Sequence, residues 1–473
     1  MRCPHKKIEK KCKYGIISTT KINNKKTVNN KSTLTENFFK SNFSGSPKTN
    51  SKDNTSQTLI PKSNYQKLLD KNSAFLKGLG ENPMYDAKII AQEKRKIKIG
   101  SKWLIDFASC NYLGFDVDPE IMESITELVS KWGTHPSWSR MLGSPAPYEE
   151  VENKLQNLLK VDTCIGLPCL TVIHHYCIFI LSEGGEIFLD KRSHRTLYEG
   201  AVKARGLGAK VTYFSSDEIG QLELLLKMST SHKKMILVDG VFSMHGQYAD
   251  IGNLAKIARN NDAILYVDDA HGFGMVGERS ENETCSYGTK GNAIINHCGE
   301  NYDNVVLTLG FSKAYSTPIS FICCDSKTAK LIKATAVPYL YTGPVNTAAL
   351  ATALKGLEVN EKRGDKIRLK INKMCQRLNG AINDMGLRNE NNTDFPIFNF
   401  YLEDADKVNF VSNYLFENGV YVTLAPYPMV AQRDVGFRIQ LTAANTEDEV
   451  EYVISVLKDL DNLVRMQRKD TFA

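Results

Sequence analysis

A lysine and an aspartate follow two apolar segments of this chain in a pattern that supports carbonyl chemistry. Lys313 stands on a small polar turn just after the apolar segment 304–309, and Asp268 directly follows the apolar segment 264–267. If both segments are parallel strands, the two side chains lie at the same edge of a sheet. A lysine amine forms a Schiff base with the aldehyde of pyridoxal 5'-phosphate (PLP). A carboxylate keeps the pyridine nitrogen protonated, so that the ring accepts electrons.

Each of the two residues also has an ordinary structural interpretation. A lone Ser-Lys pair is commonly a solvated turn, and a lone Asp-x-x-His is commonly a helix cap followed by a surface histidine. Because Lys313 and Asp268 occur together after successive predicted strands, we favour a cofactor site.

Strands and helices alternate through the middle of the chain. Short apolar runs are typical of buried strands, and they occur at 186–190, 211–214, 235–239, 264–268, 305–309 and 321–324. Helical periodicity occurs at 120–132, 148–159, 219–228 and 251–260. This alternation predicts an α/β fold with a mostly parallel sheet between layers of helices, whose ligands bind at the carboxyl ends of the strands.

The two ends of the chain differ from this middle part. An amphipathic helix is predicted over 63–77, with Leu68, Leu69 and Phe75 on one side, and 88–107 alternates like a short hairpin. From residue 347 a long helix leads into a smaller α+β unit, with strands at 397–402, 420–424 and 437–441 and helices at 406–417 and 446–460. We therefore expect an extension 1–62, an arm 63–104, a large domain 105–345 and a small domain 346–473.

Positive charge is concentrated at the amino-terminal end. Residues 1–62 hold 14 Lys and Arg against 3 Asp and Glu, whereas the remaining residues hold 46 against 50. The first segment has no sustained apolar period, which predicts disorder, and organellar import is its alternative role. The body is nearly neutral and gives no reason to expect nucleic-acid binding.

The sequence contains neither a membrane-spanning segment nor a cysteine pattern typical of disulfide or metal sites. No apolar run approaches the roughly 18 residues of a membrane-spanning helix. The eleven cysteines form no Cys-x-x-Cys pair and fall mostly in apolar segments. This favours reduced core thiols in a cytoplasmic compartment, and we expect no metal site.

Six motifs, in order, resemble the α-oxoamine synthases, a family of PLP enzymes that condense an amino acid with an acyl thioester and release carbon dioxide. The resemblance covers roughly residues 82–460. It rests on Ile105-Asp-Phe-Ala-Ser-Cys-Asn111-Tyr112-Leu-Gly114, Ser193-His194, Asp239-Gly-Val-Phe-Ser243-Met-His-Gly246, Val267-Asp268-Asp-Ala-His271-Gly, Phe311-Ser312-Lys313-Ala and Arg438-Ile-Gln-Leu-Thr-Ala. It implies the fold-type I PLP-dependent transferase fold, a homodimer, and amino acid and acyl-CoA (or acyl-carrier protein) substrates.

The resemblance also implies a role for each matching residue. Lys313 and His194 are the catalytic candidates: the lysine forms the Schiff base and removes the α-proton, and the histidine stacks on the ring and positions the substrates. The further cofactor-binding residues are Asp268 at the pyridine nitrogen, His271 and Ser243 at the phenolic oxygen, Ser312, and Thr342, which the partner subunit lends to the phosphate. The substrate-binding residues are Arg438, whose planar guanidinium suits a carboxylate, Asn111 and Tyr112.

Three of these residues have structural alternatives. His194 is also a suitable cap for the helix near Thr196, Ser243 a suitable turn residue before Gly246, and Arg438 a suitable partner in an inter-domain ion pair.

The chain departs from the family pattern around the cofactor phosphate. The family's glycine-containing phosphate loop is replaced by Pro168-Cys-Leu-Thr171-Val-Ile173. The proline lacks an N–H donor, and the cysteine replaces a permissive glycine. The family threonine three residues before the lysine is Gly310, the glycine pair after it is Ile319-Ser320, and the usual histidine is Tyr148. These differences concern phosphate affinity and substrate class, while the lysine and its aspartate are kept.

Two short segments favour the serine palmitoyltransferase branch, Gly80-Glu-Asn-Pro83-Met-Tyr85 and Ser109-Cys-Asn-Tyr112. The glycine-rich signature of aminolevulinate synthases is missing from 133–143. Two other functions are left open. A PLP aminotransferase on the same fold uses the same lysine and aspartate, and a partner subunit keeps the fold but binds PLP weakly.

Overall fold

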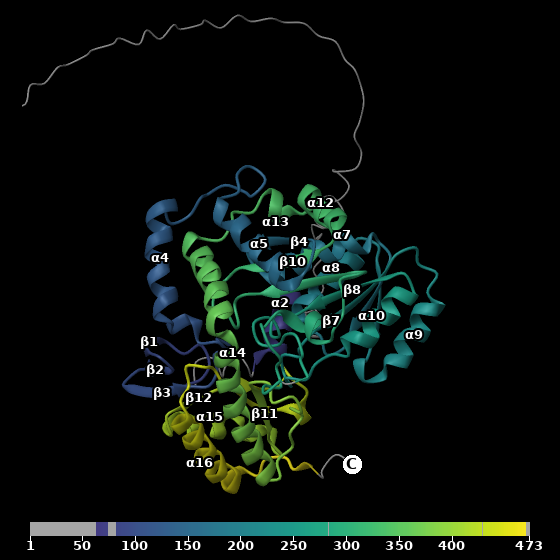
Figure 1. Ribbon diagram of the computed structural model, residues 1–473. Helices are drawn as coiled ribbons and strands as arrows, with labels where there is room; N and C mark the ends of the chain where they lie inside the picture. The colour runs from purple at the N-terminus through teal and green to yellow at the C-terminus, as the bar shows by residue number, and fades with distance from the viewer. Residues whose placement is uncertain (1–62, 74–81, 282, 428, 470–473) are drawn as a thin grey trace, which may run out of the picture. The chain divides into compact units, whose positions relative to one another are not determined.

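The computed structural model describes residues 63–73, 82–281, 283–427 and 429–469 (Figure 1). Asn64–Ala473 forms one compact unit. The predicted extension 1–62 lies outside the described residues, as does Phe75 of the predicted first helix.

A seven-stranded sheet forms the centre of the large domain, in the order β4-β10-β9-β8-β7-β5-β6. The strands β9, β8, β7, β5 and β6 pair in parallel, whereas β10 runs antiparallel to both of its neighbours, β4 and β9. The bounds are β4 (Thr163–Leu167), β5 (Glu186–Asp190), β6 (Lys210–Phe214), β7 (Lys234–Asp239), β8 (Ala263–Asp268), β9 (Val305–Gly310) and β10 (Ser320–Cys324). The prediction of a mostly parallel α/β sheet is confirmed.

Strand β4 is absent from the sequence-based strands, and it carries a glycine, Gly166. The glycine is required by packing. A Cβ at Gly166 would lie 2.9 Å from Phe321 Cε1 and 3.2 Å from Tyr148 Cδ1. Tyr148, which replaces the family histidine, is fully buried here and its hydroxyl accepts the backbone N–H of Val345 at 2.8 Å. This residue therefore has a structural role in the core.

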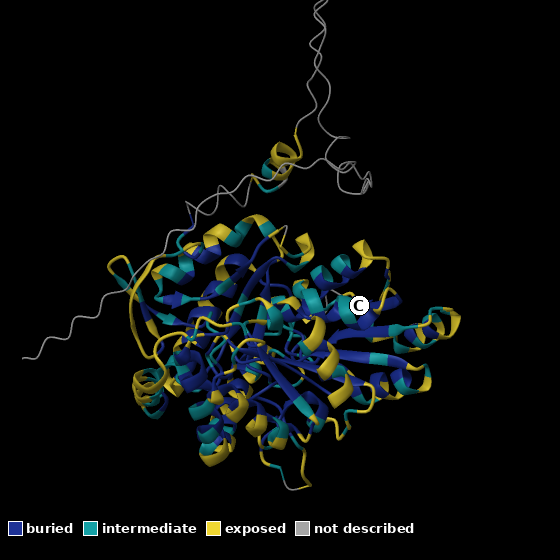
Figure 2. Ribbon diagram, turned by 90° about the horizontal axis from the view of Figure 1, so that it is seen from above, coloured by how far each residue is buried: buried dark blue, intermediate teal, exposed yellow. Residues whose placement is uncertain are grey.

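Helices cover both faces of the sheet, and Figure 2 shows the buried strands between more exposed helices. Successive residues of strand β5 belong to two different hydrophobic core clusters. Ile187 and Leu189 share one cluster with Leu197 of α8, whereas Phe188 shares the other with Leu222 of α9. The helices are α4 (Pro119–Trp132), α5 (Ala146–Leu159), α6 (Leu170–Ile173), α7 (Phe179–Ser182), α8 (Arg195–Gly206), α9 (Ile219–Met228), α10 (Ile251–Asn260), α11 (Ala293–His297), α12 (Ser326–Thr335) and α13 (Val337–Leu340). A π-helical turn, His174–Ile178, joins α6 to α7.

The long helix α14 (Thr347–Asp384) runs from the large domain into the small domain and packs against α4 (Figure 1). Inside the small domain, an antiparallel sheet has the order β11-β14-β13. Its strands are β11 (Ile397–Tyr401), β13 (Thr423–Ala425) and β14 (Gly436–Gln440), and its helices are α15 (Val408–Glu417) and α16 (Glu447–Val464).

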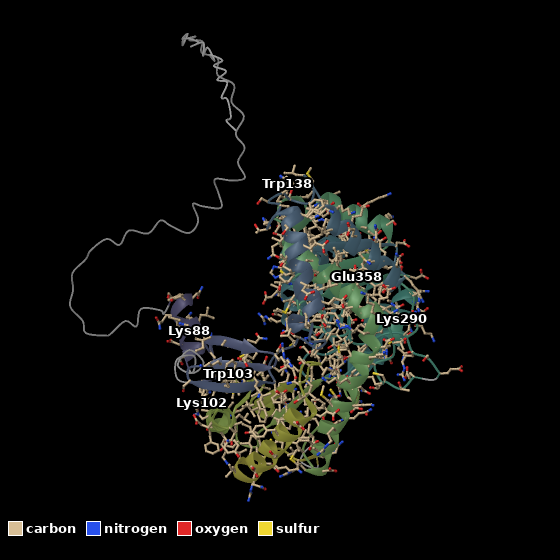
Figure 3. The ribbon with its side chains drawn as sticks, turned by 60° about the vertical axis from the view of Figure 1, so that its left-hand side comes forward. Lys88, Lys102, Trp103, Trp138, Lys290 and Glu358 are labelled. Carbon is tan, nitrogen blue, oxygen red and sulfur yellow. The ribbon has the colours of Figure 1, made fainter. Side chains whose placement is uncertain are left out.

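The amino-terminal arm and the small domain share a second sheet. It contains β1 (Ile89–Glu93), β2 (Lys96–Ile99), β3 (Lys102–Asp106) and β12 (Val420–Tyr421), in that order. The predicted hairpin is thus three antiparallel strands, with Trp103 exposed on β3 (Figure 3). The single strand predicted at 420–424 divides at Val422, because its two halves pair with different partners, β3 and β14.

The first described helix, α2 (Asn64–Lys71), lies within the predicted 63–77, of which 74–77 fall outside the described residues, and its Leu68 is 61% exposed. None of the helices in the described part of the chain is both long and apolar enough to cross a membrane.

Candidate active site

A cavity of about 230 Å³ opens where the parallel strands end. Residues that follow β4, β5, β7, β8 and β9 all contribute to its wall. Five of the predicted site residues line this one cavity: Lys313, Asp268, His271, His194 and Ser312. The expectation that the lysine and the aspartate share a sheet edge therefore agrees with the geometry.

Asp268 is the last residue of β8 and is buried. Its Oδ1 accepts the backbone N–H of Ala270 at 3.1 Å, and its Oδ2 lies 3.6 Å from Nε2 of the buried His174. Burial raises the pKa of Asp268 to about 7, while the charge of Lys313 acts in the opposite direction. A cation placed against this carboxylate would stabilise its ionised form.

Lys313 stands on a turn that rests on an aromatic cluster. Tyr315 stacks on Phe273 with ring centroids 5.1 Å apart, and it lies 4.6 Å from the ring of Phe311. Within the turn, the N–H of Thr317 donates to the carbonyl of Phe311 at 3.1 Å. These contacts give the turn a fixed shape without the glycine pair that is usual after the family lysine.

His194 is both a helix cap and a cavity residue. Its Nδ1 lies 3.3 Å from the backbone nitrogen and 2.8 Å from Oγ1 of Thr196, at the start of α8. The backbone N–H of His194 donates to both carboxyl oxygens of Asp239, at 3.0 and 3.1 Å. Burial, followed by the charges of Lys313 and Arg438, lowers the pKa of His194. The imidazole is therefore biased toward its neutral form.

His271 is buried beside Tyr112. The Tyr112 hydroxyl lies 2.7 Å from Nδ1 of His271, and Tyr112 is fully buried. Burial and the charges of Lys313 and Arg438 lower the pKa of His271 well below its usual value, and burial raises the pKa of Tyr112. Tyr112 thus contacts His271, and its role in substrate binding stays a prediction.

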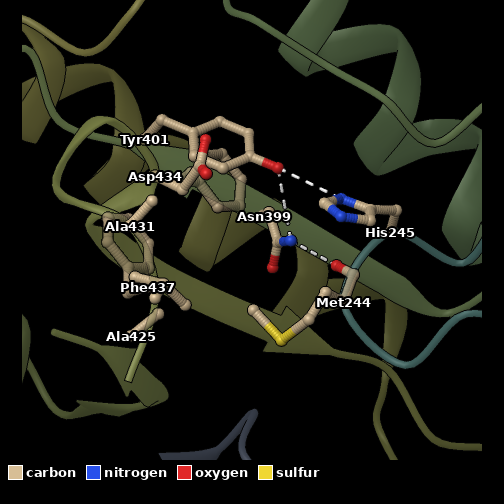
Figure 4. Close-up of a pocket in the computed structure, with 10 residues that line it drawn as sticks. Met244, His245, Asn399, Tyr401, Ala425, Ala431, Asp434 and Phe437 are labelled. Carbon is tan, nitrogen blue, oxygen red and sulfur yellow. Dashed lines mark hydrogen bonds between the residues drawn. The ribbon is translucent and has the colours of Figure 1, made fainter. Parts of the chain in front are cut away.

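The loop that carries Ser243 is held by the small domain. Arg438 on β14 donates from Nη1 to the carbonyl of Ser243 at 2.6 Å. The structural alternative for Arg438 was an inter-domain ion pair, and the contact in the structure is a hydrogen bond to a backbone carbonyl. The carbonyl of the next residue, Met244, accepts from the Asn399 amide of β11, beside a second cavity of about 190 Å³ (Figure 4). In that cavity the Tyr401 hydroxyl lies 3.2 Å from Nδ1 of His245.

Five predicted residues do not line the main cavity of this chain: Ser243, Arg438, Asn111, Tyr112 and Thr342. Asn111 lies in a turn, where its N–H donates to Ser109 Oγ at 3.2 Å and its carbonyl accepts from Gly114. Thr342 follows α13 and is half-buried. Their assigned roles stay predictions.

The altered phosphate loop lies at the start of the helix formed by α6, the π-helical turn and α7. Cys169 is exposed in the cavity, directly before Leu170, the first helical residue. The first N–H groups of a helix have no intrahelical partner and favour an anion. A Cβ at Gly310 would lie 2.9 Å from Leu170 Cδ1, so the leucine occupies the space that a family threonine needs. These two departures compensate each other.

The described residues fit PLP at three points. Lys313 supplies an amine, Asp268 supplies a buried carboxylate in need of a cation, and the helix start at Leu170 supplies N–H groups beside the hydroxyls of Thr171 and Ser312. Sequence reasoning missed Asp239, His174 and Thr196. Asp239 ends an apolar strand, as Asp268 does, and that signal was available.

Comparison with known proteins gives a consistent result. A profile of the aminotransferase class I and II family matches residues 102–457. An 8-amino-7-oxononanoate synthase of Saccharophagus degradans is 29% identical over 374 residues, which are 78% of this chain and 89% of the relative. A serine palmitoyltransferase of Sphingobacterium spiritivorum is 26% identical over 387 residues, which are 78% of this chain and 90% of the relative.

Solved structures with the same fold include serine palmitoyltransferase of Sphingomonas wittichii, with a TM-score of 0.75 at 22% identity over 85% of this chain and 98% of that chain. An SPT structure with PLP also has a TM-score of 0.75 at 22% identity, over 84% of this chain and 98% of that chain.

The contact between residues 170 and 310 can be tested by restoring the family threonine. We expect Gly310→Thr to lower the free energy of unfolding by about 1 kcal/mol, because the added Cβ meets the end of the Leu170 side chain, which must shift. Leu170→Ala should recover part of this loss in the double variant. Urea titrations of both single variants and the double variant measure the coupling, and strictly additive losses would contradict the contact.

The raised pKa of Asp268 predicts a pH-dependent stability of the PLP-free protein. Between about pH 4 and pH 7 the unfolded chain has lost this proton while the folded chain keeps it, so stability falls as pH rises. We expect Asp268→Asn to become more stable relative to the native protein by on the order of 1 kcal/mol per pH unit across that window. Denaturant titrations across this range measure the difference. Asp303→Asn, at an exposed position, should show no such trend, and a parallel trend there would refute the assignment.

Proposed function

The chain belongs to the aminotransferase class I and II family and, within it, to the PLP-dependent α-oxoamine synthases, and we propose that it condenses an amino acid with an acyl thioester. The products are an α-amino ketone, carbon dioxide and the free thiol, which is coenzyme A when acyl-CoA is the donor. The observation that carries this proposal is the single cavity that holds Lys313, Asp268, His194 and His271. When bound there, PLP supplies an electron sink for a carbanion at the amino acid α-carbon.

In this proposal each side chain has a defined task at a stated atom. Lys313 Nζ would hold the cofactor aldehyde and would take the α-proton of the amino acid. Asp268 would keep the pyridine nitrogen protonated. His194 would face the ring, Arg438 would bind the substrate carboxylate, and Ser312 with the helix start at Leu170 would hold the phosphate.

The hydrogen bond between Tyr112 and His271 restricts the tautomer of His271. We propose that the hydroxyl of the protonated Tyr112 donates to Nδ1 of the neutral His271. Nε2 then carries the ring proton and is the donor that faces a cofactor oxygen. Tyr112 therefore positions His271 in our proposal. Ser243 and Asn111 lie on loops at the same end of the sheet.

We further propose a homodimer in which the partner subunit's Thr342 completes the phosphate site. Two neighbouring loops support an interface, since His135 Nε2 lies 2.9 Å from the carbonyl of Pro344. These loops expose large apolar side chains: Trp138 is 56%, Leu142 77% and Tyr341 78% exposed. Figure 3 shows Trp138 at the end of the molecule away from the small domain.

The reaction is tested by release of coenzyme A from a panel of acyl-CoA chain lengths with Ser, Gly, Ala or Thr. We expect one pairing to release coenzyme A and carbon dioxide in equal amounts. Lys313→Ala should lower that rate by at least about a thousandfold and remove the visible Schiff-base absorbance, because the amine is the nucleophile. Lys290→Ala, an exposed lysine on the surface in Figure 3, is the matched control and should change neither.

Two results would replace this proposal. Amine transfer to a keto acid without release of coenzyme A would identify an aminotransferase. Absence of Schiff-base absorbance in excess PLP would indicate a partner subunit with a weakened cofactor site, as the Pro168-Cys169 replacement suggests.

The proposed dimer predicts the effect of charge at its interface. We expect Leu142→Glu combined with Tyr341→Glu to give a monomer with weaker PLP binding, because two buried carboxylates would face apolar surface and Thr342 would leave the site. Sedimentation velocity and PLP titration measure the two effects. Met228→Glu, at a residue of α9 that is 79% exposed, is the control. A double variant that stays dimeric would contradict this interface.

A further inference from the structure

A continuous row of polar side chains lies behind the cavity wall, between Asp268 and His194. His174 Nε2 lies 3.6 Å from Asp268 Oδ2 and 3.3 Å from Thr308 Oγ1. On the other side of the same ring, His174 Nδ1 lies 3.0 Å from Thr196 Oγ1. That hydroxyl lies 2.8 Å from Nδ1 of His194. The row therefore connects the residue assigned to the cofactor ring nitrogen with the residue assigned to the ring face.

His174 is a polar side chain in the buried core, where an imidazole is stable only if its ring nitrogens have hydrogen-bond partners. It is completely buried, packs edge-on against the ring of Tyr266 at 5.8 Å, and begins the π-helical turn His174–Ile178. Single π-helical turns inside helices are frequent at functional sites. Burial, followed by the charges of His194 and His175, lowers the pKa of His174 to about 3, so this ring is neutral and carries one proton.

The hydrogen-bond donors of the row allow two arrangements. The Thr308 hydroxyl is 3.2 Å from the carbonyl of Val267 and donates to it, so His174 Nε2–H is the donor toward Thr308 and the Asp268 carboxylate. Nδ1 of His174 is then bare and accepts from the Thr196 hydroxyl. Thr196 Oγ1 in turn accepts only if His194 carries its proton on Nδ1.

The second arrangement reverses each donor. His194 Nδ1 is bare and accepts from Thr196, as the 3.3 Å contact from the Thr196 backbone N–H requires. The Thr196 hydroxyl then accepts from His174 Nδ1–H, and His174 Nε2 has no proton to offer Asp268. An ionised Asp268 favours the first arrangement, whereas the helix cap favours the second.

We propose that His174 and Thr196 form a relay of positioning residues that couples the charge of Asp268 to the tautomer of His194. When Asp268 is ionised, as it is against a protonated pyridine ring, His194 holds its proton on Nδ1 and its Nε2 is an acceptor. When Asp268 is neutral, His194 reverts to the cap geometry with the proton on Nε2. The relay rests on the proposed function only in assigning Asp268 to the cofactor ring nitrogen.

The test measures the tautomer of His194 directly, by nitrogen-15 NMR of histidine-labelled protein at about pH 8.5, above the pKa of about 7 for Asp268. In the PLP-free native protein we expect the Nδ1–H form, and in Asp268→Asn the Nε2–H form. With Thr196→Val, which keeps the side-chain shape but has no hydroxyl, Asp268→Asn should no longer move the proton. Thr196→Ser should restore the response.

Two results would overturn the relay. One is a His194 tautomer that is the same with and without Asp268→Asn. The other is an equal response in the Thr196→Val background. Because these spectra are recorded without cofactor, they decide the relay even if Lys313 forms no Schiff base and the proposed function fails.

A second measurement addresses His174 itself. We expect His174→Phe to raise the Kd for PLP about tenfold, in the range found when the partner of a ligand-binding residue is removed. His175→Phe, the neighbouring histidine, should stay within about twofold of the native Kd. A His174→Phe protein that binds PLP like His175→Phe would contradict the proposal, and the Thr196→Val spectra decide it if His174→Phe fails to fold.

Discussion

The burial of carboxylates at one edge of the sheet is the constraint on which the site depends. Asp239 and Asp268 are paired residues at the ends of β7 and β8, and Asp269 follows directly. Burial and the charge of Asp268 raise the pKa of Asp239 well above its usual value. Such a cluster is stable only if protons, backbone N–H groups or a cation balance it. A protonated pyridine ring is a cation of the required kind, and Lys313 faces the same cavity.

The same balance accounts for the neutral histidines. Burial, followed by the positive charges of Lys313 and Arg438, lowers the pKa of both His194 and His271. Each imidazole then offers one donor and one acceptor nitrogen, and the neighbours choose between them. In our proposals, the hydrogen bond with Tyr112 selects the tautomer of His271, and the hydrogen bond with Thr196 selects the tautomer of His194. The two histidines therefore contribute neutral, oriented hydrogen-bonding groups to the cavity wall and no additional positive charge.

Sequence reasoning predicted the parts of the fold that depend on local pattern. Strands β5, β7, β8 and β9 are buried on both faces, so their apolar runs and their polar ends are visible in the sequence. That pattern also brought Lys313 and Asp268 to one cavity. The division at Val422 was not predictable, because it depends on pairing with β3, which lies more than three hundred residues earlier.

His174 was missed because its chemistry is defined by partners distant in sequence. His174 looks like part of an apolar helix until β8 and β9 place Asp268 and Thr308 beside it. The departures at Leu170 and Gly310 look like two losses until packing shows that one occupies the space left by the other. Pairwise compensation of this kind is invisible to a motif comparison that scores each position alone.

Arg438 makes a structural contact that bears on its proposed binding role. Its Nη1 holds the carbonyl of Ser243 at 2.6 Å, and this bond joins β14 to the loop that follows β7. Its Nε is buried and has no partner among the described residues. A guanidinium held at Nη1 has a fixed direction, and its planar shape suits a carboxylate. Because Arg438 does not line the main cavity, the proposed role requires the arginine to exchange the carbonyl of Ser243 for the substrate carboxylate, so that the structural contact and the binding role compete for one guanidinium.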